Sequence, residues 1–116
     1  MSGVLMQNVG PDLYSVRVVG DSMSPRYDPG GWIYVDPSFS IETDRDMVVY
    51  TENEGGEESA YLLNLVEISD ETLVFRQFKA PDKRYYFDRD EITKIHTVVA
   101  TVELVGGRGP EMQVAA

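Results

Sequence analysis

Apolar residues in this chain fall into short runs that are separated by turn-forming residues. Most runs are rich in Val, Ile, Tyr, Phe and Thr, which are the residues enriched in strands, and no stretch has a long helical period. The pattern predicts a mostly β domain of short, largely antiparallel strands over residues 13–105. The runs occupy residues 14–19, 32–35, 47–51, 60–66, 72–78, 85–87, 92–95 and 97–105.

Turn signals between the runs support this division. The Asn-Glu-Gly-Gly sequence at 53–56 predicts a hairpin loop, because glycine accepts the positive φ angles that tight hairpins need. A short helical turn is expected at most near 22–27. We interpret residues 1–12 as a linker or N-terminal arm and residues 106–116 as a flexible tail, since neither has periodicity or an anchor.

Length and composition narrow the class of protein. A chain of 116 residues with 42% hydrophobic residues predicts one domain with a real core. No apolar run approaches the roughly eighteen residues that cross a bilayer, and no segment resembles a signal peptide. There is no cysteine, so disulfides and thiolate sites are excluded. The expected location is the cytoplasm, and no cofactor or metal is expected, because the acidic residues are scattered without ligand spacing.

The net charge changes the functional picture. It is -10, from 20 acidic and 10 basic residues, whereas binding to nucleic acid requires a basic surface. Solubility alone explains such a charge. The more specific interpretation is a domain that acts beside a separate DNA-binding part and stays off the DNA itself.

The chemistry most worth testing lies in the Gly-Asp-Ser-Met turn between the first two runs. Ser22 on such a turn is expected to be presented to solvent, and it becomes a nucleophile only if a base lies beside it. The lone histidine, His96, conceivably completes a Ser-His-Asp arrangement, but its strand-like context favours a structural role. A lysine base must lose its proton by burial, from an ordinary pKa of ~10.4. Lys79 and Lys83 flank a turn and Lys94 is not embedded in an apolar run.

Three segments of the chain resemble the LexA-type self-cleaving regulators, which include LexA, lambda-type CI repressors and UmuD. VRVVGDSMSPRYDPGGWIYVDP resembles the serine-containing segment, and DRDMVVYTENEGGEESAYLLNLVEIS resembles the following hairpin. RQFKAPDKRYYFDRDEITKIHTVVATV resembles the closing segment of prophage-type repressors. The resemblance covers roughly residues 13–104. It implies a LexA/signal-peptidase-like domain, in which short strands form a compact, barrel-like assembly of twisted sheet.

The family's roles transfer to individual residues. The resemblance makes Ser22 the nucleophile and the backbone N–H groups of Asp21, Ser22 and Met23 the oxyanion hole. It places the lysine base at Leu63. Leucine cannot accept a proton, although it fills the apolar pocket of such a lysine without a desolvation cost. The resemblance therefore implies a degenerate site on a retained fold.

Two further departures accompany Leu63. Asn64 replaces the usual basic residue, and Gly31 stands where the family commonly has aspartate. Family members cut their own linker at Ala-Gly or Cys-Gly, and neither dipeptide occurs before Ser22. The 21 residues before Ser22 also leave no room for a helix-turn-helix domain.

We therefore expect the C-terminal oligomerisation domain of a phage- or prophage-type repressor. Its partners are expected to be a second or further copy of itself, DNA through an N-terminal helix-turn-helix domain outside this chain, and an antirepressor or recombinase filament. Ordinary core or sheet-edge packing is the alternative role for the residues expected at the interface between copies. Those residues are Tyr85, Tyr86, Phe87, Val98 and Val102.

Three other functions stay open. One is an active self-cleaving serine peptidase in which Lys94 or another group acts as the base. A second is a signal peptidase, which is disfavoured by the missing lysine and membrane segment. The third is a small protein of UmuD type that partners a polymerase, although such a protein normally keeps the lysine.

Overall fold

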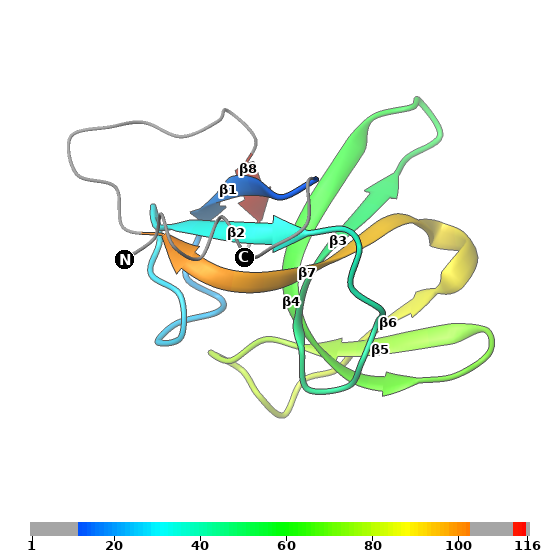
Figure 1. The fold of residues 1–116 in the computed structure, drawn as a ribbon. Helices are drawn as coiled ribbons and strands as arrows, with labels where there is room; N and C mark the ends of the chain where they lie inside the picture. The colour runs from blue at the N-terminus through cyan, green and yellow to red at the C-terminus, as the bar shows by residue number, and fades with distance from the viewer. Residues whose placement is uncertain (1–11, 103–112, 116) are drawn as a thin grey trace.

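The computed structural model describes residues 12–102 and 113–115, and it consists almost entirely of strands (Figure 1). A single 3-10 turn, η1 (Arg89–Glu91), interrupts them. The prediction of a mostly β chain is confirmed. The strands are β1 (Tyr14–Val19), β2 (Trp32–Asp36), β3 (Asp46–Glu52), β4 (Glu58–Ile68), β5 (Thr72–Arg76), β6 (Tyr85–Asp88), β7 (Ile92–Val102) and β8 (Gln113–Ala115).

The strands form one sheet in the order β3-β7-β2-β1-β8-β4-β5-β6, with an additional pairing between β3 and β4. Pairings among β1 to β7 are antiparallel, whereas β8 runs parallel to both of its neighbours. Because β3 pairs with both β7 and β4, the sheet curls strongly. It is not a closed barrel, since β8 meets β4 at the single pair Tyr61–Ala115.

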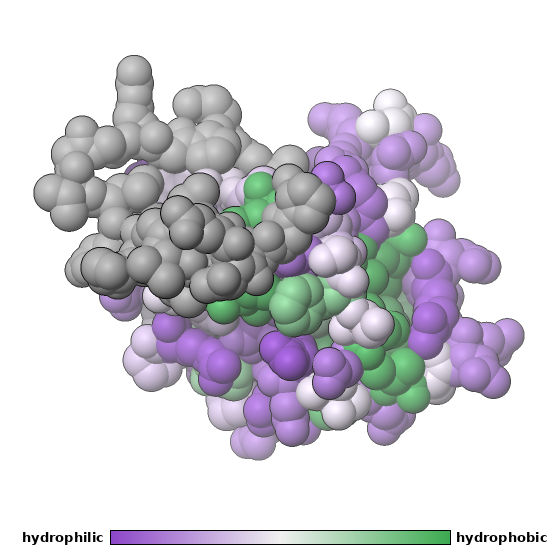
Figure 2. Space-filling model, viewed as in Figure 1, coloured by the Kyte–Doolittle hydropathy of each residue, from purple (hydrophilic) through white to green (hydrophobic). Residues whose placement is uncertain are grey.

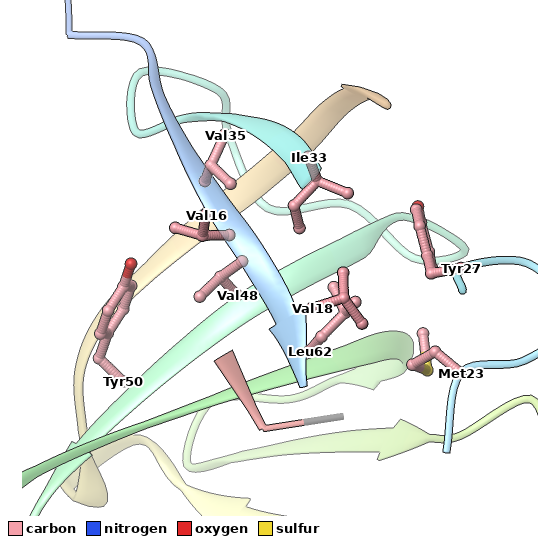
Figure 3. Packing of buried hydrophobic residues seen from close by; sticks show 9 residues of the cluster. All are labelled: Val16, Val18, Met23, Tyr27, Ile33, Val35, Val48, Tyr50 and Leu62. Carbon is pink, nitrogen blue, oxygen red and sulfur yellow. The ribbon is translucent and has the colours of Figure 1, made fainter. Parts of the chain in front are cut away.

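Two apolar clusters fill the interior, one on each face of β3 and β4. Successive side chains of a strand point to opposite faces, so neighbouring residues of β4 enter different clusters. Figure 3 shows the nine buried residues of the first cluster. They are Val16, Val18, Met23, Tyr27, Ile33, Val35, Val48, Tyr50 and Leu62. The second cluster contains Met47, Val49, Leu63, Leu65, Leu73 and Phe75.

Two strands differ from the sequence pattern. β7 is one continuous strand across His96, where the pattern suggested two runs, because His96 finds a hydrogen-bond partner in Tyr14 and needs no turn. β5 ends at Arg76 rather than at residue 78, and the segment 77–79 leaves the sheet. The hairpin at Asn53 is confirmed, with Gly56 at φ 84° and the Asn53 Oδ1 atom accepting hydrogen bonds from two backbone N–H groups.

The predicted terminal segments lie mostly outside the described residues. Of residues 1–12, only residue 12 is described. Within the expected tail at 106–116, residues 113–115 are a paired strand rather than an unanchored end. Pairing with β1 supplies the hydrogen bonds that hold them, and hydrophobic periodicity does not reveal such an interaction. Within the described ranges, no helix is long and apolar enough to cross a membrane.

Candidate functional site

The Ser22 turn leaves the sheet at the end of β1. Gly20 has φ 87°, a left-handed value that turns the chain out of the strand. The Ser24 N–H donates to the Asp21 carbonyl at 3.0 Å, and the Tyr27 N–H donates to the Met23 carbonyl at 3.1 Å. The second bond has helical spacing, as expected for residues 22–27, but the segment consists of hydrogen-bonded turns and no helix is formed.

Ser22 is less accessible than its position on a turn predicts. Its Oγ atom is buried and has no hydrogen-bond partner among the described residues. The expectation of a solvent-presented hydroxyl is therefore wrong. Unpartnered buried hydroxyls are rare, because the lost hydration is not replaced. The hydroxyl has no base bonded to it, which is the arrangement of an unactivated serine.

Lys79 lies against this turn through its backbone. Its N–H donates to the Ser22 carbonyl at 3.0 Å, which holds the segment after β5 against the turn. Its ammonium group, 58% exposed, forms an ion pair with the Asp21 carboxylate instead of contacting Ser22 Oγ. The hydrogen bond from Lys79 holds the pKa of the Asp21 carboxyl below its ordinary value. The lysine nearest to Ser22 therefore carries a counter-charge and is not a free base.

β4 carries the position that the resemblance assigns to the lysine base. Leu63 is 3% exposed and packs in the second cluster. Leu62, its neighbour, packs in the first cluster with Met23, the residue after Ser22 (Figure 3). Strand alternation therefore puts Leu62 and Leu63 on opposite faces of β4. Neither leucine is a base. The candidate position for the lysine therefore lacks one whether Leu62 or Leu63 corresponds to it.

His96 and Lys94 lie toward the other end of β1. The His96 Nδ1 atom is 2.6 Å from the Tyr14 hydroxyl, which is 2.5 Å from the Tyr50 hydroxyl. Lys94 pairs with Glu58 at 3.4 Å and lies over the Tyr50 ring. Tyr14 begins β1 and Ser22 follows its end, and a strand rises ~3.3 Å per residue, so roughly 16 Å of strand separates the two regions.

A buried carboxylate beside the turn was missed by sequence reasoning. Asp46 is 4% exposed and accepts hydrogen bonds from the Tyr27 hydroxyl at 2.5 Å and from Asn64 Nδ2 at 2.8 Å. Arg26 Nε also pairs with it at 2.7 Å. Buried charges need this kind of compensation. Asp46 therefore ties the segment after Ser22 to β3 and β4.

Asn64 extends the network to β5. Its Oδ1 atom accepts a hydrogen bond from Arg76 Nε at 2.9 Å. The guanidinium groups of Arg76 and Arg26 lie 5.3 and 5.2 Å from the centroid of the Phe78 ring, within the range of cation–π attraction. Asn64 is thus a buried link in a polar network. Asn64 pairs with Arg76 at one end of the β4–β5 pairing, and residue spacing in the sequence does not predict this contact.

Two titratable groups of this network are shifted by their surroundings. Burial, reinforced by Asp46, raises the pKa of the Tyr27 hydroxyl well above its ordinary value. Hydrogen bonding to Tyr27, together with the charge of Asp46, raises the pKa of Arg26. Tyr27 therefore stays a neutral donor and Arg26 stays a cation.

The residues expected at an interface differ in exposure. Tyr86 is 70% exposed, whereas its neighbours Tyr85 and Phe87 are partly buried against the second cluster. Val98 is partly buried against the first cluster. The backbone of Val102 pairs with Trp32 at the end of β7, and the structure does not describe the Val102 side chain. In Figure 2, hydrophilic residues lie along the right and lower edges of the coloured surface, and a band of apolar residues lies beside them toward the middle.

Comparison with known proteins gives one informative similarity. The chain is 28% identical over 98 residues to "Repressor protein C" of Rhizobium phage 16-3, and the alignment covers 81% of this chain. It covers 36% of that repressor, so the chain spans about a third of the length of the curated relative. No family model matches the chain, and no solved structure matches it. The chain therefore has a phage-repressor-like relationship over most of its length.

Proposed function

We propose that this chain is the regulatory and oligomerisation domain of a phage- or prophage-type transcriptional repressor, with a degenerate Ser-Lys self-cleavage site. The observation that carries the proposal is the similarity to a phage repressor over 81% of the chain. The resemblance of the Gly-Asp-Ser-Met turn and the following strands to LexA-type regulators points in the same direction. The site itself supports the loss of activity.

The surroundings of Ser22 support the proposed loss of activity. Self-cleavage needs a base that takes the serine proton. The hydroxyl is buried without a partner, and leucines occupy both faces of β4 at the candidate base position. Lys79 contacts the turn through its backbone and pairs with Asp21. A leucine-filled pocket keeps the fold stable without supplying chemistry.

The proposed role is to bring copies together. Among the expected interface residues whose side chains are described, Tyr86 is the most exposed, on β6, and is therefore the candidate for contacts between copies. A dimer of this domain would hold two DNA-reading heads at two half-sites, and the second head would then bind at a high effective concentration. With a net charge of -10, the domain itself would not contact DNA. An antirepressor or a recombinase filament would be the inducing partner, in the cytoplasm.

A fusion tests this role directly. The chain is joined to a helix-turn-helix head that, as a monomer, binds a palindromic operator weakly. We expect the fusion to bind the operator at least ~10-fold more tightly than the head alone. Tyr86→Glu in the fusion should remove most of the gain, whereas Ser40→Glu, on an exposed loop, should not. A fusion that binds no better than the head, with the domain folded, would contradict the proposal.

The alternative function is a self-cleaving serine peptidase of LexA/UmuD type with a non-standard base. The serine at position 22, in the turn that resembles the serine-containing segment of LexA-type regulators, is the observation in its favour. Mass spectrometry after prolonged incubation at mildly alkaline pH, with and without recombinase filament, decides between the two. A defined fragment that disappears in Ser22→Ala would establish the peptidase. An intact chain supports the degenerate site.

A further inference from the structure

One strand of the sheet has an unpaired edge. Among the described strands, β6 alone has a single neighbour, whereas every other strand pairs with at least two. That neighbour is β5, so β6 lies at the end of the sheet (Figure 1). An unpaired edge presents backbone N–H and C=O groups that can pair with a further strand. The free edge of β6 is therefore where the described sheet can be extended.

Alternate residues of β6 direct their backbone groups to this edge. In an antiparallel pair, residues that exchange hydrogen bonds with the neighbouring strand alternate with residues that do not. The Arg89 N–H donates to the Glu71 carbonyl at 2.8 Å, in line with the β5–β6 register. Two positions earlier Phe87 also bonds toward β5, so the backbone groups of Tyr86 and Asp88 point to the free edge. The Asp88 N–H agrees, since it donates at 2.8 Å to a side-chain carboxylate of the following 3-10 turn.

The side chains along this edge are complementary to a second copy of themselves. Residues 84–88 read RYYFD, with a cation two positions before Tyr86 and an anion two positions after it. Antiparallel pairing centred on Tyr86 therefore places Arg84 of each copy opposite Asp88 of the other. Opposite charges that face each other across two strands stabilise a sheet. Arg84 and Asp88 are both exposed, and neither forms an ion pair with a described residue.

The same centre suits the backbone. Because the N–H and C=O groups of Tyr86 both point outward, Tyr86 of each copy can exchange two hydrogen bonds with Tyr86 of the other. Its side chain is 70% exposed and lies on the same face as Arg84 and Asp88. Tyr85 and Phe87 point to the opposite face, where they pack against the second cluster of their own copy. A two-fold contact of this kind uses one patch on both copies and leaves no unpaired β6 edge.

We propose that two copies of this chain associate by antiparallel pairing of their β6 edges, centred on Tyr86, so that one sheet continues across the dimer. The inference rests on the proposed oligomerisation role and assigns the surface that performs it. β6 has four residues, so the contact is small, and small interfaces belong to weak, reversible complexes. The dimer therefore forms in a concentration-dependent way.

Exchanging the two charges tests the register, with the dimer dissociation constant of the full chain measured by sedimentation equilibrium. Arg84→Asp sets carboxylates opposite each other and Asp88→Arg sets cations opposite each other. Each change alone should raise the dissociation constant at least ~10-fold. An equimolar mixture of the two single variants restores both opposite-charge pairs and should dimerise like the unmodified chain. Lys83→Asp makes the same change in net charge beside the proposed pair and should not weaken the dimer.

A second variant tests the backbone contact. Tyr86→Pro removes an N–H that points to solvent in a single copy, so the fold should tolerate it, as edge strands tolerate proline. The substitution should abolish the dimer, while near-ultraviolet circular dichroism shows the chain folded. A Tyr86→Pro chain that is folded and still dimeric would refute the edge pairing.

The remaining outcomes separate this surface from the oligomerisation role. A dimer with the same dissociation constant in the unmodified, Arg84→Asp and Asp88→Arg chains overturns the β6 contact and leaves oligomerisation standing. Weakened single variants whose mixture does not recover also overturn it, because the two charges would then not face each other. An unmodified chain that is monomeric at every concentration overturns both the contact and the oligomerisation role.

Discussion

The backbone N–H of Lys79 donates a hydrogen bond to the carbonyl oxygen of Ser22 at 3.0 Å, while the ammonium group of the same lysine pairs with Asp21. The lysine beside the serine therefore holds the turn in place and neutralises its aspartate. It does not activate the hydroxyl. Lys79 thus contacts the turn at two points, through its backbone N–H and through its ion pair with Asp21.

Asp21 should report the Lys79 contact. Because the hydrogen bond from Lys79 lowers the pKa of the Asp21 carboxyl, Lys79→Met should raise that pKa toward its ordinary value. NMR titration of the Asp21 carboxyl carbon measures this. Lys83→Met, which removes a lysine from the same loop, should leave the Asp21 titration unchanged. An Asp21 pKa that is the same in all three chains would show that the ion pair does not form in solution.

The Asp46 network should contribute strongly to stability. Tyr27→Phe removes one donor from a buried carboxylate, and hydrogen bonds to charged groups are worth about 1.5–3 kcal/mol. We expect the free energy of unfolding, measured by urea denaturation, to fall by about that amount. Tyr86→Phe makes the same chemical change at an exposed position and should cost less than about 0.5 kcal/mol. If Tyr27→Phe and Tyr86→Phe lowered the free energy of unfolding equally, the hydrogen bond from Tyr27 to Asp46 would not stabilise the fold.

His96 should make stability depend on pH. Burial lowers the pKa of His96, with a further lowering by Lys94 that Asp36 partly opposes. The unfolded chain then binds a proton more readily than the folded chain, so this contribution is complete above the ordinary pKa of ~6.5 and is lost as the pH falls below it. We expect the difference in unfolding free energy between pH 7.5 and pH 5.5 to shrink in His96→Gln.

The control for His96 is the same pair of pH values in Tyr86→Phe, where the difference should match that of the unmodified chain. Carboxylates titrate in all three chains, so the comparison between them isolates the histidine. A pH difference that persists unchanged in His96→Gln would assign the effect to other groups.

A lysine supplied on β4 tests the degenerate site. Leu63→Lys and Leu62→Lys each introduce a base, on opposite faces of the strand. If the chemistry was lost with the lysine, one of them should restore Ser22-dependent cleavage of a linker that contains Ala-Gly, followed by mass spectrometry. Both should lower the free energy of unfolding by a few kcal/mol, because each buries a charged group. The matched control is the same variant with Ser22→Ala.

Folded Leu62→Lys and Leu63→Lys chains that both leave the linker intact would contradict a degenerate Ser-Lys site. Restoration by Leu63→Lys would support the position that the family resemblance assigns. Cleavage restored by Leu62→Lys would instead place the base on the face of β4 that packs against Met23. Cleavage that persists in Ser22→Ala would show that Ser22 is not the nucleophile.

Sequence alone determined the approximate positions of strands β1 to β7, the hairpin at Asn53 and the position of the serine between β1 and β2. Alternating apolar residues predict β1, because a strand with one buried face must alternate, and the hairpin at Asn53 follows from its glycines. β3 is a continuous apolar run because both of its faces are buried. The absence of a lysine from β4 is equally a property of the sequence. These features depend on residues near one another in the chain.

Only the tertiary structure decided what surrounds Ser22. Lys79 meets Ser22 across more than fifty residues, and Asp46, Asn64 and Tyr27 converge from three different elements. The pairing of the last residues with β1 also joins the two ends of the described chain. Such contacts depend on how the sheet curls and on which edges remain open, and local periodicity contains no information about either. The physical reason is that β propensity and the apolar pattern act between neighbouring residues, whereas inter-strand hydrogen bonds, burial and charge pairing join residues far apart in the sequence.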